Sequence, residues 1–371
     1  MPTPTYFSKY PPFSPDVPVA KLPVISLSKL LSEDKDESIS VFEAGRAMGF
    51  FVLDLSGCPA GEEFLKNAEI MFDLNEEVNA LPQEELMKYA YNPPTSLFGY
   101  KQLGNLKIES GLPDRVEFYN VGRDDMTGVS APRSNPPCIE NARPRIKSYM
   151  EQADGIAGII CGHLEKQLRL GKGALTKLQP VTDPSGTALR MLRYKPQPIN
   201  DRRTSLLGHT DIGSLTLLFN ITGGLQLLAP DADPSIESSW SYIKPQPNTC
   251  IVNLGDAMVE WSAGIFRSNM HRVTYAPGDQ SATTRYSLAY LVRPSGDAPM
   301  KRLAAPDYPS SLVPKIIQGK ETDNEMNARE WEIHKALAIG AGKDNARSRG
   351  GKPLRVERKD LLPAMTAVAN A

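Results

Sequence analysis

The stretch LGHTDIGSLTLLFN, residues 207–220, combines a polar beginning with an apolar end. The end is typical of a buried strand, because apolar residues dominate it and no helix breaker interrupts it. The beginning carries His209 and Asp211, two residues apart. Residues i and i+2 of a strand point to the same face, so an imidazole and a carboxylate are directed toward one point of a β-core.

Short strand-like segments surround this stretch, with turn signals such as APDADPS, PQPN and APGDQS between them. They recur at intervals of roughly 8–16 residues, which is typical of a sandwich or a jelly roll. The segments are TALRMLRYKP, SLTLLFN, GGLQLLAP, SWSYIKP, TCIVNLG, HRVTYAP and TTRYSLAYLVRP. The fold class predicted is therefore mainly β, with a jelly-roll core and flanking helices.

The region before this core mixes helices and strands. LPVISLS, residues 22–28, is predicted as an edge strand, and residues 138–170 show the strongest helical periodicity, with Gly171 and Gly173 after them. Such a helix is long enough to back a sheet. We predict a mixed α/β region over residues 1–180, the jelly-roll core over 181–295, and a C-terminal region over 296–371 with a helix at 324–339 and a basic, Ala-rich tail.

Composition excludes several classes of protein. The 371 residues include 42 Lys plus Arg and 43 Asp plus Glu, so no basic field favours nucleic acid. No apolar run approaches the roughly 18 residues of a membrane helix, and the proline-rich start lacks the pattern of a secretory signal. The four cysteines form no CxxC pair, which favours reduced thiols over disulfides or a thiolate zinc site. We expect a cytoplasmic protein that contacts neither membrane nor nucleic acid.

Histidine is scarce: the four are His163, His209, His271 and His334. His163 and Glu165 fall on the long predicted helix, where positions i and i+2 lie about 200° apart and cannot chelate one ion; we predict that both are helix-surface polar residues. His271 opens a later strand. Together with His209 and Asp211 it gives two imidazoles and one carboxylate, the facial ligand set of non-haem Fe(II) oxygenases. The alternatives are a hydrogen-bonded core histidine or a simple His/Asp polar pair.

Arg285 and Ser287 stand two residues apart in TTRYSLAY, so they share a face of the following strand. An arginine pointing into a jelly-roll interior is costly unless an anion pairs with it. Apart from Asp211, the sequence offers no obvious buried acid for this role. A bound dicarboxylate would supply the anion; the alternative is an arginine that faces outward.

With these motifs in place, the chain resembles the Fe(II)/2-oxoglutarate-dependent dioxygenases, most closely the group that includes isopenicillin N synthase. The resemblance rests on GHTDIGSLTLLF, GGLQLL, VNLGDAMVEWSAGIFRSNMHRV and RYSLAYLV, with LPVISLS, AMGFFVLD and EFYNVG upstream. It covers most of residues 20–295. It implies a double-stranded β-helix core, with Fe(II), 2-oxoglutarate and O₂ as cofactor and co-substrates.

The resemblance also implies roles for single residues. His209, Asp211 and His271 would be the iron ligands, Arg285 and Ser287 would hold the far carboxylate of 2-oxoglutarate, and Tyr194 of MLRYKPQP would approach this co-substrate. Two features depart from the family pattern. The family's asparagine in that segment is Leu192 here, and the chain between His271 and Arg285 is longer than usual.

The activity implied is the hydroxylation, desaturation or ring rearrangement of a small organic molecule, and the neutral charge and aromatic content favour a mostly apolar specialised metabolite. Phe98, Tyr100 and Phe118 are candidates for a substrate wall and Trp331 for a lid, unless these aromatics simply fill the core. Three alternatives stay open: an oxidase of this fold that does not use 2-oxoglutarate, a non-catalytic partner subunit, and a zinc hydrolase. The oligomeric state is not specified by any motif.

Overall fold

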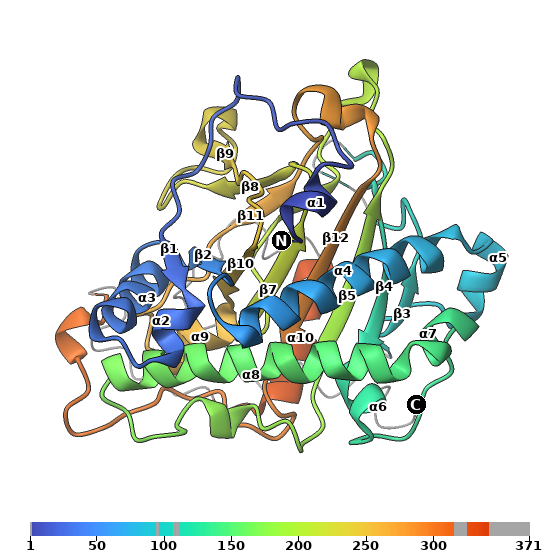
Figure 1. The fold of residues 1–371 in the computed structure, drawn as a ribbon. Coiled ribbons are helices and arrows are strands. Elements are labelled where there is room, and N and C mark those ends of the chain that lie inside the picture. The colour runs from blue at the N-terminus through green and yellow to red at the C-terminus, as the bar shows by residue number, and fades with distance from the viewer. Residues whose placement is uncertain (1, 94–95, 107, 109–110, 315–324, 341–371) are drawn as a thin grey trace.

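The computed structural model of the chain describes residues 2–93, 96–106, 108, 111–314 and 325–340. Two β-sheets form its centre, and helices pack outside them (Figure 1). The large, 8-stranded sheet has the order β1-β2-β10-β7-β12-β5-β4-β3, and the small, 4-stranded sheet has the order β6-β11-β8-β9. The prediction of a mainly β core with flanking helices is confirmed.

The strands of the large sheet run antiparallel except for the parallel pair of β1 and β2. They are β1 (Val24–Ser26), β2 (Phe50–Asp54), β10 (Thr249–Leu254), β7 (Leu215–Asn220), β12 (Arg285–Val292), β5 (Ala188–Tyr194), β4 (Val116–Gly122) and β3 (Gly99–Lys101). The small sheet comprises β6 (Leu206–His209), β11 (His271–Val273), β8 (Leu225–Leu228) and β9 (Trp240–Tyr242). The N-terminal region thus supplies the strands at both ends of the large sheet. The sheet therefore includes strands from both sides of the predicted boundary at residue 180. The three-part division itself stays a prediction.

The predicted long helix over residues 138–170 is interrupted near its start. It consists of α7 and α8, which meet at Ala142, because Pro144 has no N–H with which to continue the hydrogen-bond ladder of α7. The α-helices are α1 (Pro4–Phe7), α2 (Leu27–Leu31), α3 (Lys35–Ala47), α4 (Pro59–Ala80), α5 (Gln83–Leu86), α6 (Arg123–Thr127), α7 (Pro137–Asn141), α8 (Arg143–Gln167), α9 (Asp256–Trp261) and α10 (Ala328–Gly340).

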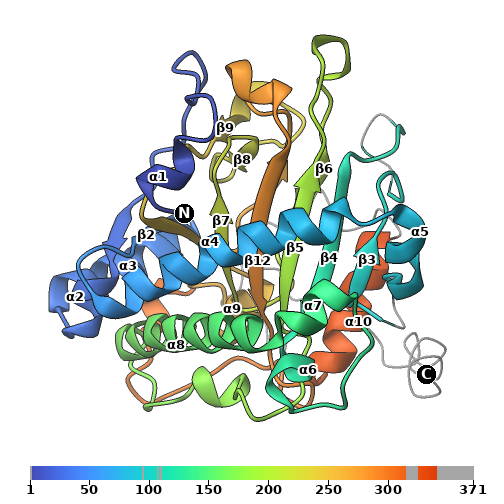
Figure 2. The same cartoon turned by 45° about the vertical axis from the view of Figure 1, so that its right-hand side comes forward.

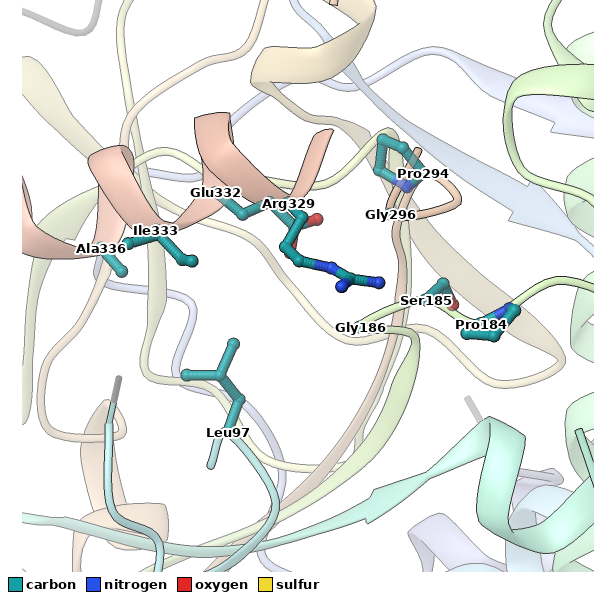
Figure 3. Close-up of a pocket in the computed structure, with 10 residues that line it drawn as sticks. All are labelled: Leu97, Pro184, Ser185, Gly186, Pro294, Gly296, Arg329, Glu332, Ile333 and Ala336. Carbon is teal, nitrogen blue, oxygen red and sulfur yellow. The ribbon is translucent and has the colours of Figure 1, made fainter. Parts of the chain in front are cut away.

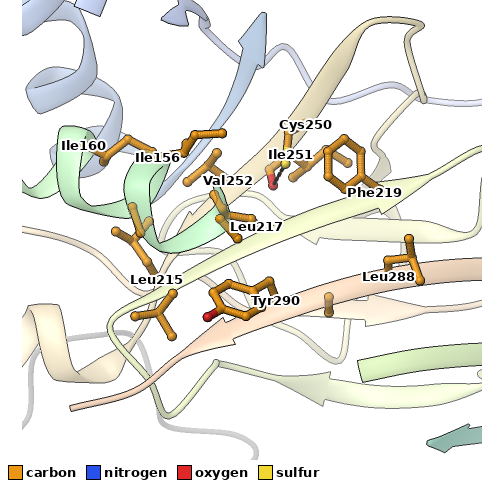
Figure 4. Close-up of a cluster of buried hydrophobic side chains, with 14 of the residues drawn as sticks. Ile156, Ile160, Leu215, Leu217, Phe219, Cys250, Ile251, Val252, Leu288 and Tyr290 are labelled. Carbon is orange, nitrogen blue, oxygen red and sulfur yellow. Dashed lines mark hydrogen bonds between the residues drawn. The ribbon is translucent and has the colours of Figure 1, made fainter. Parts of the chain in front are cut away.

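Helices α4 and α8 lie across one face of the large sheet, here called the helix face (Figures 1 and 2). The ring centroids of Phe64 on α4 and Phe219 on β7 are 5.1 Å apart, and those of Tyr149 on α8 and Tyr290 on β12 are 6.3 Å apart. Leu217, Phe219 and Tyr290 are all fully buried in this layer (Figure 4). Burial of this apolar layer is the main stabilisation that the helices give the sheet.

The opposite face of the large sheet, here called the lumen face, looks toward the small sheet. Phe50 of β2 reaches across the space between the sheets, and its ring centroid lies 5.4 Å from that of His271 on β11. Side chains alternate along a strand, so the register assigns every second residue of β5, β7, β10 and β12 to this lumen.

The prediction that His163 and Glu165 are surface residues is wrong, since both are buried. His163 Nε2 lies 3.0 Å from the carbonyl oxygen of Leu30, and Glu165 accepts hydrogen bonds from the backbone N–H groups of Gly173 and Leu175. Helix α8 is therefore covered on more than one side. The hydrogen bonds of Glu165 fix the backbone of the segment that follows the helix. The two side chains make separate contacts, as the helical spacing requires.

The C-terminal helix begins later than predicted. Its described part is α10, and residue 324, the predicted start, lies outside the described residues, as does the basic tail. Among the residues that the structure describes, no helix combines the length and the apolarity that crossing a bilayer requires.

Candidate active site

The quoted stretch is two strands joined by a bend. β6 ends at His209, and β7 begins at Leu215, so Asp211 lies in the bend and not on a strand as predicted. β6 pairs with β11 in a register that sets His209 directly beside His271. The bend then carries Asp211 back toward both rings, which the strand periodicity alone does not explain.

Three donor atoms converge at this point. Asp211 Oδ1 lies 3.8 Å from His209 Nε2 and 3.8 Å from His271 Nε2, and the three ligand atoms all lie within 4.8 Å of one another. The two imidazole centroids are 4.4 Å apart. A cluster of this size can close around one metal ion.

The other polar atom of each group is already engaged by the protein. His209 Nδ1 lies 2.8 Å from the carbonyl oxygen of Leu207, and His271 Nδ1 lies 3.2 Å from that of Asn269. A carbonyl oxygen only accepts, so each Nδ1 must carry the hydrogen and each Nε2 keeps its lone pair free. This is the orientation in which imidazole binds a metal.

The carboxylate of Asp211 is oriented in the same way. Its Oδ2 accepts hydrogen bonds from Thr216 Oγ1 at 2.5 Å and from Asn253 Nδ2 at 2.7 Å, which leaves Oδ1 facing the imidazoles. Neither Thr216 nor Asn253 was identified from the sequence. The available signal was a polar residue inside each apolar strand, LTLLFN and TCIVNL, but that signal does not name the partner.

The pKa values agree with a site prepared for a cation. Burial lowers the pKa of His209 to about 4, with the neighbouring His271 adding to the effect, so the imidazole is neutral at physiological pH. Burial alone would raise the pKa of Asp211, but His271, His209 and the donors Thr216 and Asn253 together lower it to about 2. A neutral imidazole and an ionised carboxylate are the forms that ligate metals.

A second cluster lies toward the other end of β5 and β12. Arg285 and Ser287 share the lumen face of β12, as predicted, and Arg285 Nη1 donates to Ser287 Oγ over 3.0 Å. Arg285 Nε donates to the carbonyl oxygen of Gly223 at 2.8 Å. The backbone can come this close because Gly224 adopts a φ of +116° and has no side chain. A Cβ at this position would lie 3.2 Å from Arg285 Nε.

Tyr194 joins this second cluster from β5. It pairs in register with Arg285, whose guanidinium carbon lies 4.8 Å from the centroid of the tyrosine ring. Burial lowers the pKa of Arg285, and no carboxylate pairs with it among the described residues. Both polar atoms of the Asn220 amide, beside Ser287 in the register, are buried without a hydrogen-bond partner. A carboxylate-bearing ligand fits these unsatisfied donors.

The predicted substrate aromatics occupy different places. Phe118 lies on the lumen face of β4, whereas Tyr100 points to the other side of the sheet and donates a hydrogen bond to Glu117. Phe98 packs against Gly122 with Arg133 over its ring. Phe118 on the lumen face and Phe98 against the lumen side of Gly122 stay candidates for the substrate wall, whereas Tyr100 does not face the lumen.

Trp331 lies fully buried on α10, which gives the prediction of a mobile lid no support. A pocket of about 220 Å³ opens instead between α10 and the chain that precedes β5 and follows β12 (Figure 3). Arg329, Glu332 and Ile333 line it from the helix, and Leu97 lines the opposite side. The pocket lies beside residues 184–186, which lead into the start of β5.

Comparison with known proteins bears directly on this arrangement. Residues 186–294 match the model of the 2OG-Fe(II) oxygenase superfamily, and residues 22–139 match that of the N-terminal region named for a non-haem dioxygenase in morphine synthesis. Together the two matches contain every described strand of the two sheets, and the first match contains both clusters described above.

Curated relatives match along most of their length. A 2-oxoglutarate-dependent dioxygenase of Aspergillus fumigatus is 32% identical over 343 residues, which covers 87% of this chain and 87% of the relative. A 2-oxoglutarate-dependent dioxygenase of Gibberella zeae is 27% identical over 324 residues, covering 86% of this chain and 88% of the relative.

Solved structures show the same fold. A full-length protein of Neurospora crassa, solved in complex with alpha-KG, superimposes with a TM-score of 0.69 at 22% identity, over 89% of this chain and 100% of that chain. A 2OG-Fe(II) oxygenase family protein from Caulobacter crescentus gives a TM-score of 0.68 at 21% identity, over 86% of this chain and 100% of that one. The two facing sheets are thus the predicted jelly-roll core.

Proposed function

The chain belongs to the 2OG-Fe(II) oxygenase superfamily, and from that premise we propose that His209, Asp211 and His271 are its iron ligands. The protein is an oxidoreductase that uses iron, 2-oxoglutarate and O₂ to oxidise a small organic molecule. One observation carries the ligand assignment: three free donor atoms meet within 4.8 Å while the remaining polar atom of each group is bonded to the protein.

We further propose that Arg285 and Ser287 bind the distal carboxylate of 2-oxoglutarate, with Tyr194 beside it. The support is chemical. A buried guanidinium with no acidic partner among the described residues needs an anion, and a hydroxyl and the Asn220 amide stand next to it. Because Arg285 is held by Gly223 and Ser287, its position is set before the co-substrate binds.

Bound iron supplies the redox chemistry that couples oxidative decarboxylation of 2-oxoglutarate, to succinate and CO₂, with oxidation of the substrate. The chain contributes position and exclusion of water. Thr216 and Asn253 hold Asp211, and the carbonyl groups of Leu207 and Asn269 fix the tautomers of the two histidines. The apolar Leu218 and Leu291 on the lumen face limit the access of water around the reacting groups.

We propose that the substrate is a small specialised metabolite and that the reaction is cytoplasmic, without nucleic-acid or membrane partners. The net charge of −1 supports the absence of a nucleic-acid partner, and all four cysteines are free thiols, which fits a reducing compartment. Hydroxylation, desaturation and ring rearrangement all start from the same arrangement of residues.

The test is substrate-dependent formation of succinate from 2-oxoglutarate, measured with the full chain and a panel of candidate metabolites. His209→Ala should abolish both succinate formation and anaerobic Fe(II) binding. Arg285→Met should leave metal binding intact and raise the KM for 2-oxoglutarate by about 10- to 150-fold, the equivalent of losing one charged hydrogen-bonding partner. Arg145→Met, an exposed change on α8, is the matched control.

The alternatives predict other results. O₂ uptake that depends on substrate but yields no succinate would identify an oxidase that does not use 2-oxoglutarate. Wild-type protein that fails to bind Fe(II) in an anaerobic titration would identify a non-catalytic subunit and overturn the proposal.

A further inference from the structure

A second arginine, Arg190, reaches the lumen and is not required by the iron or 2-oxoglutarate sites. It lies at the middle of β5, on the same face as Tyr194 and opposite in register to Ala289 of β12. That face also bears Thr216 and Asn253, the residues that hold Asp211. The guanidinium therefore shares the interior space with the proposed iron ligands.

The surroundings of Arg190 fix its position but leave its charge unpaired. Its Nε donates to Asn120 Oδ1 at 2.9 Å, and its guanidinium carbon lies 4.2 Å from the centroid of the Phe118 ring. Asn120 is itself held by a hydrogen bond from Nδ2 to the carbonyl oxygen of Leu97 at 2.6 Å. One edge and one face of the guanidinium are thus occupied, and the edge with the two terminal amino groups is left available.

No acidic side chain among the described residues forms an ion pair with Arg190. The neighbouring cations do have partners: Lys101 pairs with Asp114, and Arg293 pairs with Glu332 at 3.0 Å. Burial lowers the pKa of Arg190, and Tyr91, Asp211 and Tyr194 oppose this effect. The proposed function assigns Asp211 to iron. A guanidinium stays protonated in proteins, so this position keeps a positive charge.

The lumen is accessible at the level of Arg190. Arg190, Leu218 and Leu291 are partly exposed although they lie in the middle strands of the large sheet. Their sequence neighbours on the helix face, Leu189 and Leu217, are fully buried. The exposed surface of these three residues therefore faces interior space and combines one cation with an apolar wall.

Charge balance indicates which kind of molecule fits this space. Under the proposed function, Fe(II) with Asp211 leaves one positive charge and Arg285 adds another. The dianion 2-oxoglutarate neutralises both. The charge of Arg190 remains, and a cation that is mostly withdrawn from water without a counter-ion is costly.

We propose that Arg190 binds the carboxylate of the oxidised substrate, which is therefore an apolar organic acid. This inference rests on the proposed function and names the substrate class of the same site. The two terminal amino groups of the guanidinium match a carboxylate in a bidentate pair. Asn120 and Phe118 act as positioning residues that hold the guanidinium in place.

The pocket beside α10 provides the approach for such an acid. Leu97 lines the pocket (Figure 3). Its carbonyl oxygen is the acceptor for Asn120, so the pocket adjoins the Arg190 cluster. Most of the other lining residues are apolar. Arg329 also lines it and forms no ion pair among the described residues, whereas the charge of Glu332 is offset by Arg293. The pocket therefore favours an anion with an apolar body.

The test measures binding to the full chain loaded with Mn(II) and 2-oxoglutarate, using isothermal titration calorimetry. The probes are benzoic, phenylacetic, cinnamic and decanoic acids, each with its methyl ester and primary amide. We expect at least one acid to bind wild-type protein about 10- to 150-fold more tightly than its amide, as one charged hydrogen-bonding partner provides. Arg190→Met should reduce binding of the acid to the level of the amide and leave the Kd of 2-oxoglutarate unchanged.

Further variants separate the role of Arg190 from a general loss of structure. Arg190→Lys keeps the charge but not the planar fork, so it should give an intermediate Kd, and Asn120→Ala should weaken the acid less than Arg190→Met does. Arg145→Met should change nothing. Thermal unfolding confirms that each variant is folded.

Several outcomes would overturn the inference: no acid of the panel binds, acid and amide bind equally, or Arg190→Met retains the affinity for the acid. A rise in the Kd of 2-oxoglutarate in Arg190→Met would instead assign this arginine to the co-substrate. If wild-type protein binds neither Mn(II) nor 2-oxoglutarate, the proposed function itself fails, which is a separate result.

Discussion

Two partly buried carboxylates, Asp154 and Asp211, lie on opposite sides of the large sheet, and their pKa values shift in opposite directions. On the helix face, burial raises the pKa of Asp154 to about 6, although Tyr290 donates to it at 2.7 Å. On the lumen side, burial also acts to raise the pKa of Asp211, but two histidines and two hydrogen-bond donors outweigh it and bring the value to about 2.

The difference shows how one sheet serves two purposes. Its helix face excludes water and offers a carboxylate few compensating partners, so the neutral acid is favoured there. Its lumen face collects donors and cations before any ligand binds, so a charged group is favoured. We expect mutations on the helix face to change stability and mutations on the lumen face to change ligand binding.

The largest stability effect should come from the helix face. Phe219→Ala removes a fully buried ring that packs against Phe64, and we expect it to lower the free energy of unfolding by about 3–5 kcal/mol. Denaturant unfolding measures this change. The KM for 2-oxoglutarate should stay within about twofold of the wild-type value at temperatures where the variant is folded; a large rise in KM with little loss of stability would contradict the separation of the two faces.

A smaller effect, on metal affinity, should come from the lumen face. Asn253→Ala removes a donor to Asp211, and we expect Fe(II) or Mn(II) affinity to fall about 10- to 100-fold, the usual cost of losing a residue that orients a metal ligand. Anaerobic metal titration measures it. The matched control is Asn67→Ala, which removes a side-chain amide hydrogen bond to Gln152 on the helical layer and should leave metal affinity unchanged.

Much of the lumen could be predicted because its chemistry depends on local spacing. Residues i and i+2 of a strand share a face in any fold, so the common orientation of Arg285 and Ser287 on β12 could be predicted from the sequence. The pairing of His209 with His271 could be proposed because histidine is scarce and because the motifs resemble a known family. The position of Asp211 in a bend, and not on a strand, came from the structure alone.

Arg190 and Asn120 were missed for a physical reason. Arg190 and Asn120 contact each other because β4 and β5 are adjacent strands of the sheet. Nothing in the sequence of either strand indicates that the two strands pair. Both faces of β5 are largely covered, so its sequence, ALRMLRY, does not alternate between apolar and polar and does not reveal which face looks into the lumen. His163 and Glu165 were misplaced on the same ground, since α8 is covered on sides that its periodicity leaves open.

The smallest expected effect tests the opening comparison through pH. The pKa of Asp154 is about 6 in the folded chain against an ordinary value of 3.8, so the folded state holds this proton more tightly than the unfolded state. The stability that it contributes is present below pH 4 and is lost as the pH rises through 6. Asp154→Asn mimics the neutral acid, and relative to wild type it should gain about 1–2 kcal/mol in unfolding free energy between pH 5 and pH 8.

Asp211→Asn provides the contrast, measured on metal-free protein by the same denaturant unfolding. The lowered pKa of Asp211 contributes stability above pH 4 that disappears only as the pH falls toward 2, so the difference from wild type should be constant between pH 5 and pH 8. A pH-dependent gain in Asp154→Asn beside a pH-independent change in Asp211→Asn would place the two carboxylates in opposite electrostatic environments. Equal pH trends in the two variants would mean that the two faces of the sheet do not shift carboxylate pKa values in opposite directions. The helix face would then need another source of charge compensation for Asp154.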